Sequence, residues 1–238
     1  MGESITGPVE ELRDIVGRLR RLMKEDMEMG LEAPNLSPST LRYLDGGVSG
    51  FASLEDLRQF IGDCRRCKLC QGRTKLVFGE GSSKAELVFV GEGPGRDEDL
   101  AGLPFVGEAG RLLTRIVAAM GLTREDVYIC NVVKCRPPKN RDPEEDEVEA
   151  CLPFLKEQLK LIRPQVICAL GRVAGQTLLG RDFRMTRDRG SWYTFLGTQL
   201  MPTFHPAYLL RNPSAKRQVW EDIQKVMKRL GLEVKKDA

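Results

Sequence analysis

The cysteines are the residues of this 238-residue chain that most directly suggest chemistry. Cys64 and Cys67 are separated by two residues, a spacing that brings two thiolates onto one metal, and Cys70 extends the motif. Because the chain has seven cysteines but a single histidine, four cysteines are the natural ligand set of a metal site. Cys135 follows a predicted strand, and Cys151 lies in the predicted helix after it. The spacing alone does not separate a zinc ion from an iron–sulfur cluster.

A second group of candidate residues is polar and lies near the ends of apolar stretches of the chain. Glu92 and Glu98 lie in a glycine-rich segment, where acids would suit a site at which a substrate develops positive charge. Asn131 interrupts an apolar stretch, and its planar amide, with one acceptor and two donors, could bind the edge of a pyrimidine. His205, the only histidine, follows the last apolar stretch. Each also has a plain structural explanation, namely a surface turn, an asparagine bonded to a nearby loop, or a buried histidine.

The elements that must position these residues follow from four short, nearly continuous apolar stretches. They predict strands covered on both faces, at residues 87–90, 127–133, 166–170 and 200–204. Residues 192–204 also have the pattern of a hairpin that leads into the last strand.

Helical patterns alternate with the strands. They cover residues 109–120, a segment that starts near Asp142 and Pro143, residues 172–179, and a segment that starts near Ser214. The alternation predicts an α/β fold, a three-layer αβα sandwich around a short, mostly parallel four-stranded sheet. In such sheets ligands bind at the carboxyl ends of the strands, which is where the candidate polar residues fall.

The N-terminal segment has a different character from the rest of the chain. Apolar residues at spacings of three and four predict a helix over 8–29, and prolines and glycines predict a linker over 30–50. We therefore expect an N-terminal helix and linker extension, residues 1–51, before the main domain, residues 52–238. The extension could bind a replication or repair partner, pack on its own domain, or form a loose tail.

Composition limits the class of protein. Hydrophobic residues make up 41% and charged residues 30% of the chain, with a formal net charge of +3, as in ordinary globular proteins. We find no apolar run long enough for a membrane span and no signal peptide, so we expect a cytoplasmic protein without membrane association. Cysteines in that compartment are expected as thiols or metal ligands.

Five motifs together resemble family 4 uracil-DNA glycosylases, the iron–sulfur branch of the uracil-DNA glycosylase superfamily. The motifs are GEGPG at 91–95 with ED at 98–99, GLPFVG at 102–107, Asn131 with VKCRPP at 133–138, HPAYLLRNP at 205–213, and Cys64-x₂-Cys67 with GRT at 72–74 and VFGEG at 77–81. The likeness runs from about residue 60 to residue 230 in the family's order. The motifs are highly specific as a set, although no one of them is.

The resemblance implies roles for residues of a base pocket. Phe105 matches the aromatic residue that stacks on the extruded uracil, and Asn131 matches the amide that pairs with its edge. Glu92, beside Gly93, matches the acid near uracil C5 that helps to exclude the methyl group of thymine. Glu98 matches the acid that positions water or stabilises the sugar cation, and His205 matches the histidine facing uracil O2; we expect these two to be catalytic.

The resemblance also implies a cofactor and a wedge. Cys64, Cys67, Cys135 and Cys151 match the four ligands of a [4Fe–4S] cluster. Leu209 or Leu210 would fill the gap that the extruded nucleotide leaves in the duplex.

Basic residues surround both cysteine segments, and we expect them to form a positive patch that binds DNA phosphates unless they are ordinary surface charges. They are Arg65, Arg66, Lys68, Arg73, Lys75, Lys134, Arg136, Lys139 and Arg141.

The implied function is DNA repair. A monomeric, nucleoid-associated enzyme would flip uracil out of single- or double-stranded DNA and hydrolyse its N-glycosidic bond, leaving an abasic site without a lyase step. Three alternatives stay open from the residues: a non-catalytic, metal-containing DNA-binding module, a polymerase-accessory protein, and a glycosylase for another deaminated base. Cys70 is an additional cysteine beside the motif and could replace one ligand.

Overall fold

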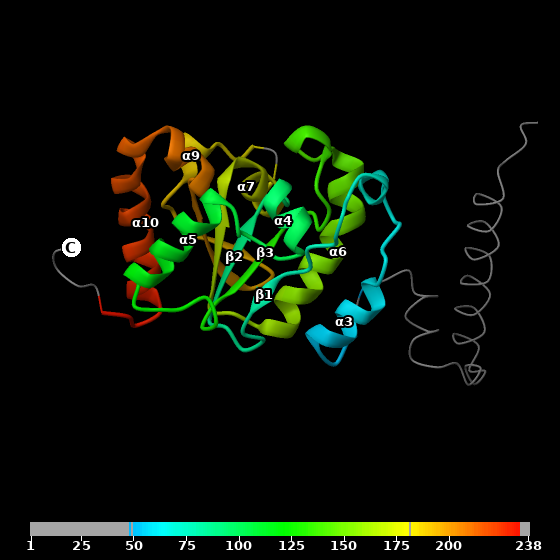
Figure 1. The fold of residues 1–238 in the computed structure, drawn as a ribbon. Coiled ribbons are helices and arrows are strands. Elements are labelled where there is room, and N and C mark those ends of the chain that lie inside the picture. Colours follow the sequence, from blue (N-terminus) through cyan, green and yellow to red (C-terminus); the bar gives the residue numbers. More distant parts are fainter. Residues whose placement is uncertain (1–47, 49, 181, 234–238) are drawn as a thin grey trace, which may run out of the picture. The chain divides into compact units, whose positions relative to one another are not determined.

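The predicted apolar stretches form the four central strands of the sheet in the computed structural model (Figure 1). These are β2 (Leu87–Gly91), β3 (Tyr128–Asn131), β4 (Val166–Leu170) and β6 (Thr198–Thr203), which pair in parallel in the order β3-β2-β4-β6. Every residue of β2, β3 and β4 is buried, as expected for strands with helices on both faces.

The sheet has six strands rather than the four that we predicted, because a short antiparallel strand lies at each edge. β1 (Glu80–Gly81) pairs with β3, and β5 (Tyr193–Phe195) pairs with β6. β1 consists of two residues without a hydrophobic pattern, so the sequence gives no signal for it. β5 is the first arm of the predicted hairpin, which turns at Leu196 and Gly197, both at positive φ. The α/β class is confirmed.

Helices cover both faces of this sheet. They are α3 (Leu54–Ile61), α4 (Arg96–Ala101), α5 (Glu108–Ala119), α6 (Glu145–Ile162), α7 (Gly171–Leu179), α8 (Met185–Asp188), α9 (Pro206–Arg211) and α10 (Lys216–Arg229), with short 3₁₀ turns η1 (Lys68–Gln71), η2 (Pro138–Asn140) and η3 (Pro213–Ala215). None of these helices is long and apolar enough to cross a membrane.

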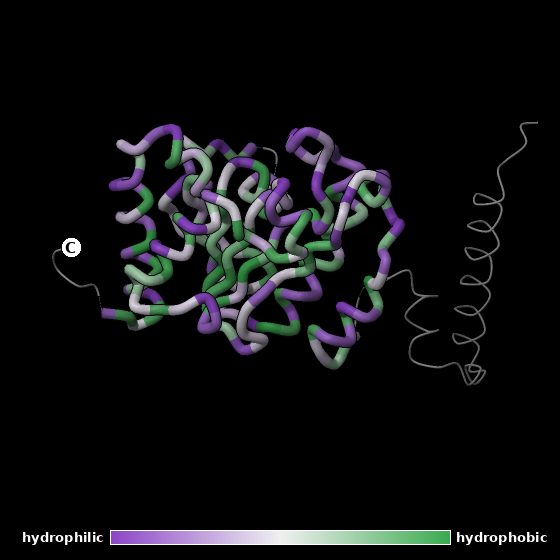
Figure 2. The backbone as a smooth tube through the Cα atoms, in the orientation of Figure 1, coloured by the Kyte–Doolittle hydropathy of each residue, from purple (hydrophilic) through white to green (hydrophobic). Residues whose placement is uncertain are grey.

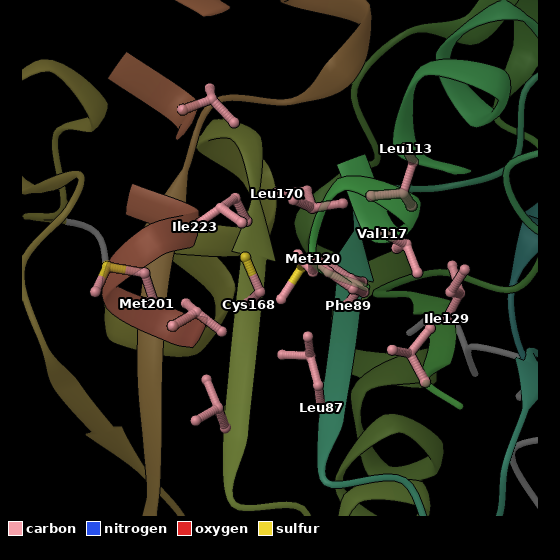
Figure 3. Packing of buried hydrophobic residues seen from close by; sticks show 14 of the residues in the cluster. Leu87, Phe89, Leu113, Val117, Met120, Ile129, Cys168, Leu170, Met201 and Ile223 are labelled. Carbon is pink, nitrogen blue, oxygen red and sulfur yellow. The ribbon is translucent and has the colours of Figure 1, made fainter. Parts of the chain in front are cut away.

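Alternate strand residues feed two hydrophobic cores, one on each face. Leu87 and Phe89 of β2 pack with α5 and α10 (Figure 3), whereas Val88 and Val90 pack with α6 and α7. Apolar segments accordingly gather in the middle of the domain and polar ones lie outside (Figure 2). The predicted three-layer arrangement follows from this alternation.

The helix after β3 begins later than the sequence suggested. α6 starts at Glu145 with Glu144 as its N-cap, and the Glu144 backbone N–H donates to the Glu147 carboxylate at 2.8 Å. Asp142, near which we predicted the start of this helix, is instead ion-paired with Arg172. A carboxylate in the first turn of α6 therefore binds the N-cap backbone, and the helix begins after Asp142 and Pro143.

The structure describes residues 48, 50–180 and 182–233. Contacts divide the chain into Met1–Gly50 and Phe51–Ala238, and all of the elements named above belong to the second unit. The helix predicted over 8–29 lies outside the described residues, and so does its linker apart from residues 48 and 50.

Candidate active site

A pocket of about 550 Å³ opens at the carboxyl ends of the parallel strands. It brings together residues from the segments after β2, at the end of β3 and after β6, as the topology requires. Every residue predicted to bind or cleave the substrate lines it: Glu92, Gly93, Glu98, Phe105, Asn131 and His205. Asp142, Tyr208 and Arg211 also line this pocket and were not predicted to do so.

Asn131 presents an unsatisfied acceptor to the pocket. Its side chain is 2% exposed, and its Oδ1 atom has no hydrogen-bond partner among the described residues. Gly91 lies opposite in the parallel register, where a Cβ atom would come 2.4 Å from this oxygen. A buried polar atom without a partner costs about 1–3 kcal/mol, so its presence in a pocket indicates a ligand-binding group.

The segment after β2 approaches the end of β3 closely. The N–H of Val133 donates to the carbonyl of Glu92 at 3.1 Å. A Cβ atom at Gly93 would come 2.8 Å from the Val133 side chain, so only glycine fits there without a shift. Glycine therefore lets the backbone of residues 92–93 form one wall of the pocket.

His205 is held as a neutral imidazole with a defined tautomer. Its Nδ1 accepts a hydrogen bond from the Ala207 N–H at 3.1 Å, at the start of α9. Burial lowers the pKa of His205 to about 4, and the positive charge of Arg211 contributes in the same direction. Since Nδ1 is an acceptor, the proton of the neutral ring lies on Nε2, which can donate.

Phe105 packs against His205 from a strained turn. The two rings are stacked with centroids 5.4 Å apart and planes 29° from parallel. Phe105 has a φ of 54°, in the left-handed region that a bulky residue seldom adopts. Arg124 stabilises this turn by donating to the carbonyls of Pro104, at 2.8 Å, and Phe105, at 3.2 Å, while it pairs with Glu80 at 2.7 Å.

Glu98 ties two loops together at the pocket wall. Its Oε2 accepts from the Gly95 N–H at 3.1 Å, and its Oε1 accepts from the N–H groups of Val106 and Gly107 at 2.9 and 3.0 Å. Three backbone donors thus hold one carboxylate next to Phe105. Its negative charge lies in the pocket lining, and Oε2 keeps capacity for a further hydrogen bond.

Glu92 is half-buried in the same pocket and has an unusual affinity for protons. The pKa of Glu92 is raised to about 7, mainly by burial and also by the charge of Asp142, while Arg172 opposes the rise. A group with this pKa changes its charge close to neutral pH, and such groups cluster at functional sites.

The two candidate wedge residues differ in position. Leu209 is 1% exposed and belongs to the hydrophobic core, so it is not available to enter DNA, and that part of the prediction is corrected. Leu210 is 40% exposed on the same short helix, α9. α9 has six residues, too few for the sequence periodicity to tell its buried side from its exposed side.

The four predicted cysteine ligands come from three separate segments. Cys64 follows α3, Cys67 precedes η1, Cys135 follows β3 and Cys151 lies on α6. Burial raises the pKa of Cys135 to about 11 and that of Cys151 to about 12. Arg73 brings two of the segments together, because one of its nitrogens donates to the Cys64 carbonyl at 2.8 Å and to Cys135 Sγ at 3.0 Å. Within the described part of the chain, no three His, Cys, Asp or Glu residues form a group that could hold a metal ion.

Hydrogen-bond donors face three of these sulfur atoms. Arg73 donates to Cys135 Sγ at 3.0 Å and Arg66 to Cys64 Sγ at 3.3 Å, and the backbone N–H of Lys134 donates to Cys151 Sγ at 3.3 Å. N–H groups directed at sulfur stabilise thiolate over thiol, which is the form that binds metal. Three of the four predicted ligand sulfurs, those of Cys64, Cys135 and Cys151, thus have a donor that favours the thiolate form.

One residue of the predicted basic patch, Lys134, is 1% exposed, so it is not available to DNA phosphates and that part of the prediction is corrected. Four other members have acidic partners. Arg65 pairs with Asp63, Lys68 with Glu144 and Asp146, and Arg141 with Glu147. The fourth, Arg73, has a side chain that is 7% exposed, donates to Cys135 Sγ and pairs with Asp63. Lys68 connects η1 to the start of α6, whereas Arg65 pairs within its own segment and stays 81% exposed.

The profile of the uracil DNA glycosylase superfamily matches residues 78–224. A type-4 uracil-DNA glycosylase of Thermotoga maritima is 49% identical over 176 residues, which cover 72% of this chain and 92% of the relative. The type-4 enzyme of Archaeoglobus fulgidus is 47% identical over 182 residues, or 73% and 92% of the two chains. That of Sulfurisphaera tokodaii is 46% identical over 183 residues, or 73% and 83%.

The chain belongs to the type-4 uracil-DNA glycosylase family. The resemblance drawn from the sequence motifs is thereby confirmed. The pocket residues taken from those motifs lie together in this type-4 glycosylase. Two polar residues near them, Arg124 and Lys134, were not assigned to the pocket, because a charged residue in a turn or beside a strand carries no sequence signal of its tertiary partner.

Proposed function

We propose that this protein is a DNA-repair enzyme that excises uracil from DNA by hydrolysing the N-glycosidic bond and leaves an abasic site. The observation that carries this proposal, beyond family membership, is the unpaired Oδ1 of Asn131 in the strand-end pocket. An acceptor in that position complements the N3–H of uracil, and the amide N–H₂ complements uracil O4. Cytosine has no N3–H and presents a donor in place of O4, so the same amide rejects it.

The base reaches the pocket by extrusion from the DNA stack, at a cost of a few kcal/mol. We assign Phe105 as the aromatic surface against which the extruded base stacks. Leu210 is exposed on α9, a helix that contributes to the pocket lining. It is our candidate for the side chain that takes the place of the extruded base in the duplex. Base stacking on an aromatic ring contributes about 1–3 kcal/mol, enough to offset much of the extrusion cost.

Bond cleavage leaves negative charge on uracil and positive charge on the sugar. We assign Nε2–H of His205 as the donor to uracil O2, which its neutral state and Nδ1 hydrogen bond make available. The carboxylate of Glu98, fixed by three backbone N–H groups, would stabilise the sugar cation and orient water toward C1′. Because both groups are held in place before reaction, they need little reorganisation in the transition state.

Glu92 and Gly93 form the wall that we place beside uracil C5. The half-buried Glu92 side chain would leave no room for the methyl group of thymine. With its pKa raised to about 7, the Glu92 carboxyl is substantially neutral when uracil departs as an anion below that pH.

We propose that Cys64, Cys67, Cys135 and Cys151 hold a [4Fe–4S] cluster. When bound, the cluster would supply a covalent cross-link between the segment after α3, the end of β3 and α6. In this proposal, it stabilises the wall of the pocket that carries Asn131 and takes no part in bond cleavage.

The substrate also suggests where the enzyme works. We propose that it acts as a monomer on uracil-containing DNA of the cytoplasmic nucleoid, in either single or double strands. That residues 1–51 bind a replication or repair partner stays a prediction.

A direct assay tests the function. Purified protein is incubated with an oligonucleotide containing one uracil, single-stranded or paired with guanine, and abasic sites are then cleaved with alkali. Oligonucleotides with thymine or cytosine at the same position are the matched controls. Cleavage at uracil alone is expected, and absence of product from both uracil substrates would refute the proposed activity.

A further inference from the structure

Lys134 is a fully buried lysine that lies three residues after Asn131, which lines the base pocket. It is 1% exposed, and its Nζ donates to the backbone carbonyl of Asn131 at 2.7 Å and to Oε1 of Gln158 at 2.6 Å. Lysine is almost never buried unless its donors are paired, because removing the amino group from water is costly. The two short hydrogen bonds are the compensation, so the side chain has little freedom to move.

The second of these partners is itself fixed. Gln158, on α6, is fully buried, and its amide donates to the Phe78 carbonyl at 2.9 Å and to the Tyr128 hydroxyl at 3.1 Å. The network therefore spans α6, β3 and the segment before β1. Because Lys134 bonds two members of this network and Gln158 bonds three, the position of Nζ is set by the fold and not by the lysine chain alone.

Asn131 depends on its backbone for its position. It is the last residue of β3, and its Oδ1 has no partner in the described structure to hold the amide. The Lys134 ammonium group bonds the carbonyl of this same residue, at the point where the strand ends. The N–H of the same peptide, that of Val132, donates to the Gly91 carbonyl at 2.9 Å, so Lys134 supplies the second of two hydrogen bonds that hold the peptide next to the Asn131 side chain.

From this geometry we infer that Lys134 is a positioning residue that aims the Asn131 amide into the base pocket. The inference rests on the proposed uracil excision. It adds a residue that touches neither the base nor the sugar but sets the orientation of the group that pairs with the base.

The backbone of Lys134 contacts one of the predicted cluster ligands, whereas its side chain contacts Asn131. Its N–H donates to Cys151 Sγ at 3.3 Å, and its carbonyl accepts from the Val77 N–H at 2.8 Å. Replacing the side chain leaves both backbone groups in place. Iron binding and the aim of Asn131 can therefore be separated by substitution at this one residue.

The test uses Lys134→Met, which keeps an unbranched chain but removes the donor. Single-turnover excision from a single-stranded uracil oligonucleotide should slow about tenfold, and inhibition by free uracil should weaken by a similar factor. Binding to a uracil-free oligonucleotide and the iron content per chain should stay within about twofold of wild type. Lys84→Met, the same change at an exposed lysine before β2, is the control and should have wild-type rates.

A double-mutant cycle with Asn131→Ala separates positioning from general destabilisation. In the Asn131→Ala background, Lys134→Met should slow excision by less than about twofold, because the group that it aims is already absent. Full additivity of the two losses would overturn the inference, as would loss of iron together with activity in Lys134→Met. If that variant does not fold, Lys134→Gln, which keeps a shorter donor, enters the same cycle with the same expected non-additivity.

The experiments distinguish failure of the proposed function from failure of the positioning role of Lys134. A wild-type protein that releases no uracil would overturn the proposed function. An active wild type with an equally active, folded Lys134→Met would overturn only the positioning role.

Discussion

The ring of Phe105 is stacked on the ring of His205, with centroids 5.4 Å apart. The two residues come from different strand-end segments, and the stack is the contact by which the loop after α4 meets the loop after β6. Substitution of either residue therefore alters the packing of the other ring. Variants must be chosen to separate the effect of stacking from that of hydrogen bonding.

His205→Phe keeps an aromatic ring for this stack but removes the Nε2–H donor. We expect the single-turnover excision rate to fall by about 10²–10³-fold, the typical effect of removing one donor to a developing anion. Binding to uracil-containing DNA should change much less, and His205→Ala should impair both. A His205→Phe protein with an undiminished rate would remove the histidine from the chemistry.

Protein stability should depend on His205 at acidic pH. The pKa of His205 is about 4 in the folded protein, against about 6.5 for an unperturbed histidine. The unfolded chain thus binds a proton at this residue in a pH range where the folded protein does not. Stability is lost as pH falls from 6.5 to about 4, by about 3 kcal/mol at most. Urea unfolding at pH 7.5 and pH 4.5 should show a smaller difference for His205→Asn than for wild type.

Asn131→Asp replaces the donor half of the amide with a second acceptor. Oxygen would then face uracil O4, and an unpaired or repelling polar contact in a buried site costs about 1–3 kcal/mol. Excision of uracil should slow by about 10–100-fold, and preference for uracil over cytosine should decline. Competition between the two bases in otherwise identical oligonucleotides measures this preference, and an unaltered ratio would contradict the assignment.

The raised pKa of Glu92 moves the pH dependence that this carboxyl gives the reaction from acidic pH to near neutral pH. With a pKa of about 7, its side chain is neutral below that pH and ionised above it. An ionised Glu92 beside a departing uracil anion is unfavourable, so the single-turnover rate should fall as pH rises through 7. Glu92→Gln imitates the neutral form and should have a flat profile from pH 6 to 8. A wild-type profile that also stays flat would show that Glu92 does not face the leaving base.

The sequence predicted the strands that position the site better than it predicted the surface around it. β2 and β4 appear as unbroken apolar runs because both of their faces are covered, and the residues at the strand ends follow from topology. Pairing over long sequence distances has no such local signal. Lys68 was assigned to a DNA-binding patch, but its acidic partner Glu144 lies 76 residues away. Arg124 likewise acts on the carbonyls of Pro104 and Phe105, which only the folded chain brings near.

The cysteine assignment can be tested by comparing two substitutions that differ only in position. Cys135→Ser alters a sulfur that accepts a hydrogen bond from Arg73 and lies on the segment following Asn131. Loss of a residue that only supports a ligand typically weakens metal binding by about 10–100-fold, so loss of a ligand itself should weaken iron binding by more. The brown colour should disappear on purification. Cys70→Ser, on η1, is the matched control and should keep its iron, colour and excision rate. Because metal binding contributes to folding, Cys135→Ser should also unfold at lower temperature than Cys70→Ser. Colour retained in Cys135→Ser and lost in Cys70→Ser would transfer the fourth ligand position to Cys70.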